Sequence, residues 1–144
     1  SLQAALSLSQ AAEFVDKYPE KAAHPIAQLG RNVSGGQKQR LSIARALART
    51  PEILIFDDSF SALDYKTDAT LREGLAKELP DTTKIIVAQR ISTIRNADQI
   101  LVLDRGEIAG LGTHDALMAS CTVYREIAMS QLSEEELKKG GASK

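Results

Sequence analysis

Runs of apolar residues predict four short strands in this chain. Residues 53–56 read Ile-Leu-Ile-Phe without a polar interruption, and residues 85–88 and 100–103 are similarly apolar. Unbroken rather than alternating runs are typical of strands in a parallel sheet that is covered on both faces. Asp104-Arg105-Gly106 is a turn signal before a fourth run at 107–111, so these last two runs are expected to form a hairpin.

Segments with helical periodicity lie between and around these strands. The clearest spans about 65–79, where Leu71, Leu75 and Leu79 recur every four residues. A strand–helix–strand unit with parallel strands is therefore expected, which places the chain in the α/β class. The other predicted helices are one or two short ones within 2–15, one at about 35–49, a short one capped by Thr113, and a last one containing Val123, Tyr124 and Ile127.

The composition is that of an ordinary globular protein. With 144 residues the chain is expected to form one domain, and its net charge of −1 leaves no polybasic block that would indicate a nucleic-acid partner. The single cysteine, Cys121, excludes an internal disulfide and is expected to be a small buried or half-buried thiol rather than a catalytic one. No apolar run in the sequence approaches the ~20 residues that a membrane-spanning helix needs.

One stretch, residues 33–64, carries the candidate chemistry. Ser34 is a favoured N-cap because its hydroxyl can accept from a backbone N–H of the first helical turn. Gly35 and Gly36 have no Cβ, so a ligand can approach this turn closely. The free N–H groups and the positive dipole end of a helix start suit an anion such as phosphate.

Two carboxylates follow the strand at 53–56. Asp57 and Asp58 come at its carboxyl end, where open α/β sheets place their ligands. A carboxylate there can hold Mg²⁺, usually through water. A glycine turn alone is most often a helix start, and an Asp alone is often a turn residue. Their order and spacing within one segment indicate a nucleotide triphosphate as the ligand.

This segment resembles the second half of the nucleotide-binding domain of ATP-binding cassette (ABC) proteins of the exporter type. Val33-Ser34-Gly35-Gly36-Gln37 is similar to the family's signature motif, residues 53–58 to its Walker B strand, and Ser61-Ala62-Leu63-Asp64 to its D-loop. The resemblance extends to about Gln131. It implies a truncated RecA-like P-loop NTPase core with part of the helical signature subdomain.

The resemblance also implies how the chain is organised. Residues 1–132 would form the C-terminal part of the nucleotide-binding domain. Within it, 1–50 would belong to the helical subdomain with the signature helix, and 51–132 would supply core strands and helices. Residues 133–144 are expected to be a charged flexible tail.

The roles of the site residues follow from the same resemblance. In the family, two nucleotide-binding domains dimerise head to tail, and each ATP lies between one subunit's Walker B and switch residues and the other's signature. Asp57 would then bind Mg²⁺, Ser34-Gly35-Gly36-Gln37 would contact the partner's ATP, and Asp64 would couple the two sites. Asp58 stands where hydrolytic members have a Glu base, and Gln89 stands at the switch position, where the family has His.

The two departures from the family, at Asp58 and Gln89, would weaken the same ATP site. Asp58 is one methylene shorter than Glu, and a misplacement of about 1 Å can cost ~10²-fold in rate. Gln89 can hydrogen-bond a γ-phosphate but cannot carry a positive charge or shuttle protons. Beside an intact signature, this is the pattern of one half of a heterodimeric exporter that has one degenerate and one competent site.

The glycine loop that cradles phosphates, G-x-x-x-x-G-K-[ST], does not occur in this sequence. In the family this loop lies upstream, so the chain is expected to be the C-terminal portion of its domain and to be inactive alone. A transmembrane domain is expected elsewhere in the same full-length chain, with the nucleotide-binding part at the cytoplasmic face of the cell membrane.

The expected function is therefore ATP-driven export by a heterodimer. One alternative is a non-hydrolytic nucleotide-binding module with a regulatory or dimerisation role. A less favoured alternative is an ABC ATPase of DNA repair, because such proteins carry a long heptad coiled coil within the domain and this sequence has none.

Overall fold

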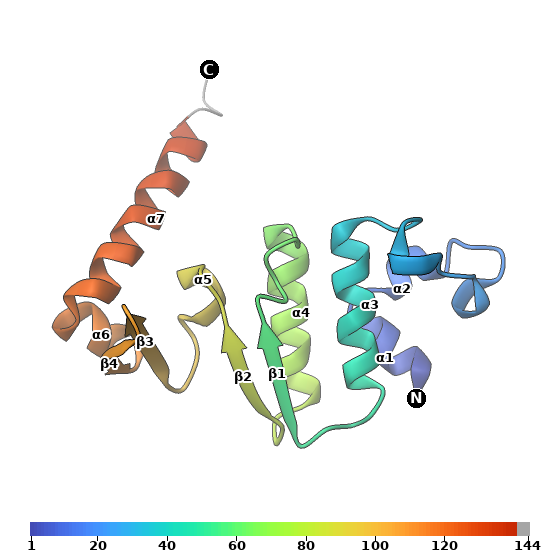
Figure 1. The fold of residues 1–144 in the computed structure, drawn as a ribbon, viewed down its shortest axis with the longest axis horizontal. Helices are drawn as coiled ribbons and strands as arrows, with labels where there is room; N and C mark the ends of the chain where they lie inside the picture. Colours follow the sequence, from blue (N-terminus) through green and yellow to red (C-terminus); the bar gives the residue numbers. More distant parts are fainter. Residues whose placement is uncertain (141–144) are drawn as a thin grey trace. The chain divides into compact units, whose positions relative to one another are not determined.

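The computed structural model describes the backbone of residues 1–140 and the side chains of residues 1–131. It is an α/β structure, which confirms the expected fold class, and it divides into two compact units at residues 87 and 88 (Figure 1). Each unit is described by itself below. The expected division at residue 50 stays a prediction, although the elements on either side of that residue share one hydrophobic core.

The first unit is built on a pair of parallel strands joined by a helix. Strands β1 and β2 pair in register from Ile53 opposite Thr83 to Asp57 opposite Val87, and α4 connects them. This confirms the predicted strand–helix–strand unit. The elements of this unit are α1 (Leu2–Leu8), α2 (Ala12–Val15), the 3₁₀ turns η1 (Lys21–Ala23) and η2 (Gln28–Gly30), α3 (Gly35–Leu47), β1 (Ile53–Asp57), α4 (Tyr65–Glu78) and β2 (Thr83–Val87).

The helices of this unit pack on one face of the strand pair. Leu71 and Leu75 of α4 are fully buried, as their helical spacing predicted, and they join Leu54 and Phe56 of β1 in one core. Burying a leucine side chain fully contributes roughly 1.5–3 kcal/mol. This core therefore fixes α3 and α4 against β1, and it positions the carboxyl end of β1, where the two acidic residues of the candidate site lie.

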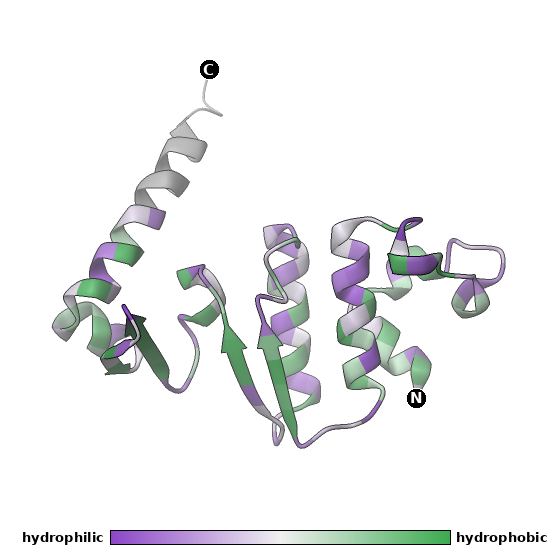
Figure 2. Ribbon diagram, viewed as in Figure 1, coloured by the Kyte–Doolittle hydropathy of each residue, from purple (hydrophilic) through white to green (hydrophobic). Residues whose placement is uncertain are grey.

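The opposite face of the strand pair is open in the described chain. Apolar runs of this kind suit strands that are covered on both faces, but the elements of this unit cover only one face of the pair. The exposed fractions are 58% for Ile53, 69% for Ile55, 48% for Ile85 and 53% for Val87. Figure 2 shows both strands coloured as hydrophobic along most of their length. Neighbouring side chains on a strand point to opposite faces, and the elements of this unit cover only one of them.

The second unit contains an antiparallel hairpin, as predicted. Its turn is formed by Arg105 and Gly106, which both have positive φ angles of 48° and 82°. Two successive left-handed residues give a turn whose twist matches that of the strands, and glycine adopts this conformation without steric cost. The elements here are α5 (Ile91–Ile94), β3 (Ile100–Asp104), β4 (Glu107–Gly112), α6 (His114–Ser120) and α7 (Thr122–Gly140).

The helices of the second unit also cover only one face of the hairpin. Ile100 and Val102 are buried against α6 and α7, whereas Leu101 and Leu103 are about half exposed, so the expectation of a fully buried strand is wrong for β3. Cys121 is buried in the same core, which confirms the expected structural thiol.

The last described element is the helix that the sequence predicted around Tyr124. Thr113 caps the preceding helix, α6, by accepting from the N–H of Ala116 at 3.3 Å. Helix α7 continues to Gly140, so it crosses the predicted start of the tail at residue 133, and residues 141–144 lie outside the described part. Among the described helices, none is long and apolar enough to cross a bilayer.

Candidate functional site

The first part of the candidate site is the start of α3. The Ser34 hydroxyl accepts from the backbone N–H of Gln37 at 3.2 Å, and the Gln37 side-chain oxygen accepts from the backbone N–H of Ser34 at 2.9 Å. These two bonds form a capping box, which confirms Ser34 as the N-cap and assigns Gln37 a role in the fold that sequence reasoning missed. Within the described residues, the Ser34 O–H finds no acceptor, so its proton is available to a ligand.

The glycine pair at this helix start packs against a loop of the same chain. A Cβ on Gly36 would lie 3.1 Å from the carbonyl oxygen of Ala62, which is closer than ordinary contact, whereas a Cβ on Gly35 would meet the Ala62 Cβ at 4.0 Å. We had attributed both glycines to the close approach of a ligand. The structure shows that the missing Cβ of Gly36 also leaves room for the backbone of the loop that follows β1.

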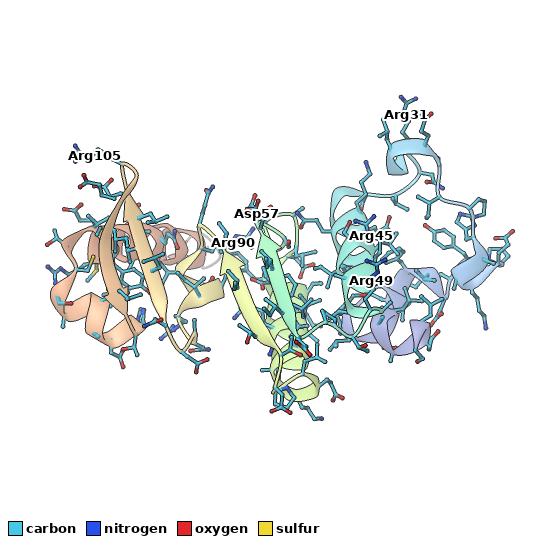
Figure 3. All side chains as sticks on the ribbon, turned by 60° about the horizontal axis from the view of Figure 1, so that its bottom comes forward. Arg31, Arg45, Arg49, Asp57, Arg90 and Arg105 are labelled. Atoms are coloured by element: carbon cyan, nitrogen blue, oxygen red, sulfur yellow. The ribbon has the colours of Figure 1, made fainter. Side chains whose placement is uncertain are left out.

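The two acidic residues lie at the carboxyl end of β1, as predicted. Figure 3 shows Asp57 at this end of the strand, and both Asp57 and Asp58 are exposed to solvent. Asp58 has a left-handed backbone with φ of 50°. Its N–H donates to the carbonyl of Val87 at 3.0 Å, and its carbonyl accepts from the Ser61 hydroxyl at 3.0 Å. These bonds hold the backbone of Asp58 in this sparsely populated conformation.

Asp64 caps helix α4, a role that sequence reasoning did not assign to it. One carboxylate oxygen accepts from the backbone N–H of Thr67 at 2.9 Å, and the other accepts from the Thr67 hydroxyl at 2.8 Å. These two bonds hold the pKa of the Asp64 carboxyl below its ordinary value, because they stabilise the ionised form. The carboxylate is exposed and remains reachable from solvent.

Gln89 belongs to the second unit and follows the end of β2 by two residues. Its side chain is exposed, and its carbonyl accepts from the side-chain amide of Gln131 at 2.6 Å. The side-chain oxygen of Gln131 in turn accepts from the N–H of Ile91 at 2.8 Å. A glutamine of α7 therefore fixes the backbone around the switch position, a contact between residues 42 apart that no local pattern predicts.

The donor set at the end of β1 fits a magnesium ion that is bound together with phosphates. In the described chain no three His, Cys, Asp or Glu side chains gather into a metal cluster. Mg²⁺ commonly takes one or two carboxylates, with water and substrate phosphates as its other ligands. Asp57, a single exposed carboxylate, suits that arrangement. It also lines an open cleft of about 340 Å³ between α3 and β1, together with Gln39, Ser42 and Ser59.

Gln39 is the residue of this region that sequence reasoning missed. It lies four residues after Gly35 and three after Gly36, so it shares their face of α3. Its side chain bonds to the loop after β1, where its oxygen accepts from the N–H of Ala62 at 3.1 Å. The helical spacing from the glycines was the available signal.

Comparison with known proteins shows that the sequence of this chain is similar to those of ABC transporter ATP-binding proteins. A family model described as ABC transporter matches residues 5–61. The chain is 54% identical over 106 residues to an uncharacterized ABC transporter ATP-binding protein of Mycobacterium tuberculosis, a match that covers 74% of this chain and 18% of the relative. It is 42% identical over 130 residues to the ATP-dependent lipid A-core flippase of Haemophilus influenzae, covering 90% of this chain and 22% of the relative.

A solved structure agrees with these relatives. A bacterial Atm1-family ABC exporter with ATP bound superposes with a TM-score of 0.86 at 36% identity, and the match covers 90% of this chain and 23% of that one. The chain spans about a fifth of the length of the two curated relatives described above.

Proposed function

Because this chain belongs to the ABC transporter family as part of an exporter-type nucleotide-binding domain, we propose that it binds and hydrolyses ATP at an interface with a second such domain. In the whole protein, this reaction would drive transport across a membrane, with the nucleotide-binding part on the cytoplasmic side. The transmembrane domain would be another part of the same full-length chain. The names of the flippase and of the exporter support this reading over a regulatory module or a DNA-repair ATPase.

The observation that carries the proposal is the exposed, capped start of α3. Its capping box uses one lone pair of the Ser34 hydroxyl and leaves the proton available. That proton and the N–H groups of the first turn can bind the γ-phosphate of an ATP held by the partner domain. Gly35, Gly36 and Gln37 shape this surface, and Asp64 would couple the two sites.

The site on this chain's own strand would be the weaker of the two. Asp57 would hold Mg²⁺, which neutralises phosphate charge when it is bound. Asp58 would be a short and poorly placed base, and Gln89 would contact the γ-phosphate without supplying a positive charge. We therefore propose a heterodimer in which this chain contributes an intact Ser34 to the competent site and Asp58 to the degenerate one.

The steady-state ATPase activity of the purified full-length pair tests this assignment. We expect Ser34→Arg to lower turnover by ~10²-fold or more, because it removes a donor to the transferring phosphate and adds steric hindrance. We expect Asp58→Asn to stay within a few-fold of wild type. Asp58→Glu alone should not raise turnover greatly, since Gln89 remains at the switch position.

Ser34→Asp separates catalysis from folding in the same assay. Aspartate is a favoured N-cap, so α3 should be retained, but its carboxylate offers no proton and repels phosphate. We expect this variant to lose turnover while its thermal unfolding stays close to that of wild type. If Asp58→Asn abolishes activity while both Ser34 variants are tolerated, the two sites are assigned the wrong way round.

A further inference from the structure

The side chain of Gln39 bridges α3 and the loop that follows β1. Its oxygen accepts from the N–H of Ala62 at 3.1 Å, and its amide nitrogen lies 3.4 Å from the carbonyl oxygen of Asp58 and 3.5 Å from the Ser61 hydroxyl. The first contact is a good hydrogen bond, and the other two are long. One amide group thus faces three groups of a single loop.

The loop of residues 58–62 meets α3 at a second point. The Ala62 carbonyl lies where a Cβ on Gly36 would be 3.1 Å away, so the helix backbone and the loop backbone are in close contact. The loop begins at Asp58, whose φ of 50° needs support from its surroundings. The carbonyl of Asp58 accepts from Ser61 at 3.0 Å and is also the one that the Gln39 amide faces.

The bridge therefore links two groups that the proposed function assigns to different ATP sites. The start of α3 carries Ser34, which would face the partner's ATP. The loop carries Asp58 of this chain's own site and leads directly into Asp64. Packed elements shift as units rather than deform continuously. A fixed link between the start of α3 and the loop therefore transmits a displacement of one to the other.

We propose that Gln39 is a positioning residue that holds the start of α3 and the loop of residues 58–62 in one fixed arrangement, so that the two ATP sites respond together. This inference rests on the proposed function. The hydrogen bonds of Gln39 go to backbone groups of the loop and to the Ser61 hydroxyl, not to the carboxylate of Asp57 or Asp58. The effect of Gln39 on turnover passes through the placement of Ser34 and Asp64, where a shift of about 1 Å is costly.

Glutamine suits this role because its amide offers an acceptor and two donors in one plane. Methionine has a similar length and retains the packing, but it makes neither bond. Glutamate keeps the oxygen that accepts from Ala62 and loses the donor toward Asp58. Gln3 is exposed on α1, so Gln3→Ala is a matched control for the loss of a glutamine.

The test uses the full-length pair and measures amide hydrogen exchange together with ATPase kinetics. We expect Gln39→Met to raise exchange in the peptide that covers residues 58–64 and to lower kcat about ten-fold, with KM and the unfolding temperature close to wild type. Gln39→Glu should retain protection of the Ala62 N–H and recover part of the turnover. Gln3→Ala should change neither quantity.

Three results would overturn the inference, and each has a different meaning. Unchanged exchange in Gln39→Met means that the bridge does not hold the loop. Raised exchange with unchanged kcat means that the bridge is only structural. If Ser34→Arg leaves wild-type turnover, the proposed function itself fails and the inference falls with it, whatever the exchange data show.

Discussion

The packing at the start of α3 predicts that two adjacent glycines respond in opposite ways to the same substitution. At Gly35 an added methyl group would meet the Ala62 Cβ at 4.0 Å, which is an ordinary contact. At Gly36 it would lie 3.1 Å from the Ala62 carbonyl oxygen, inside the 3.4 Å at which ordinary contact begins. Both residues have negative φ, so alanine can adopt the backbone conformation at either position.

The magnitudes follow from these distances. Replacing glycine by alanine at a compatible position stabilises by about 0.4–1 kcal/mol, chiefly by restricting the unfolded chain. We expect this gain for Gly35→Ala. At Gly36 an overpacking cost of about 1–3 kcal/mol opposes the same gain, because the atom in the way belongs to the backbone and cannot rotate aside. The two variants should therefore differ in free energy of unfolding by about 1–3 kcal/mol.

Equilibrium urea unfolding, followed by circular dichroism, measures this difference. The slope m should be the same for both variants, so that the midpoint reports stability directly. The reasoning is refuted if Gly36→Ala unfolds at the same urea concentration as Gly35→Ala. That result would mean that the loop at Ala62 moves aside freely, and that Gly36 is not required by intrachain packing.

Two further predictions concern the charge at Asp64 and the open strand face. Thr67 lowers the pKa of Asp64 below its ordinary value, so the stabilisation by the ionised form is complete above that ordinary value and is lost as the pH falls through the lowered one. Asp64→Asn keeps the cap but cannot ionise, so wild type should unfold at a higher temperature than the variant at pH 7. This difference in unfolding temperature should vanish in acid, and an equal difference at both pH values contradicts the prediction. The exposed apolar face around Ile55 should make the isolated chain self-associate in a light-scattering concentration series, and Ile55→Lys should reduce the effect. A strictly monomeric wild-type chain at high concentration would exclude it.

The sequence predicted those features that depend on neighbouring residues. Ser34 and Thr113 were recognised as caps because a hydroxyl before a helix acts within one turn. The turn at Arg105 and Gly106 was recognised because glycine adopts positive φ readily. The spacing of Leu71 and Leu75 likewise predicted a buried helix face.

Features that depend on distant residues were missed or wrongly assigned. The bond between Gln39 and Ala62 joins residues 23 apart. The helical spacing of Gln39 from the two glycines indicates that it shares their face of the helix, but not which residue lies opposite. Asp64 is an exception, because its partner Thr67 is only three residues away; the cap was within reach of local reasoning, but only a coupling role was assigned to this residue. The apolar run at Ile53–Phe56 indicates what a strand is suited to pack against, but by itself it does not show which of its side chains, such as Ile55, this chain leaves exposed.

The left-handed backbone of Asp58 bears on how this site could change by mutation. Aspartate tolerates positive φ better than most residues, because its short polar side chain can bond locally, whereas glutamate lacks this advantage. The backbone strain at this position therefore differs between the two substitutions, from glutamate to aspartate and from aspartate to glutamate. Shortening the carboxylate relieves the backbone, and lengthening it again restores strain before any catalytic benefit can be selected. In the site that we propose, this asymmetry would make the loss of a glutamate base at this position easier than its recovery.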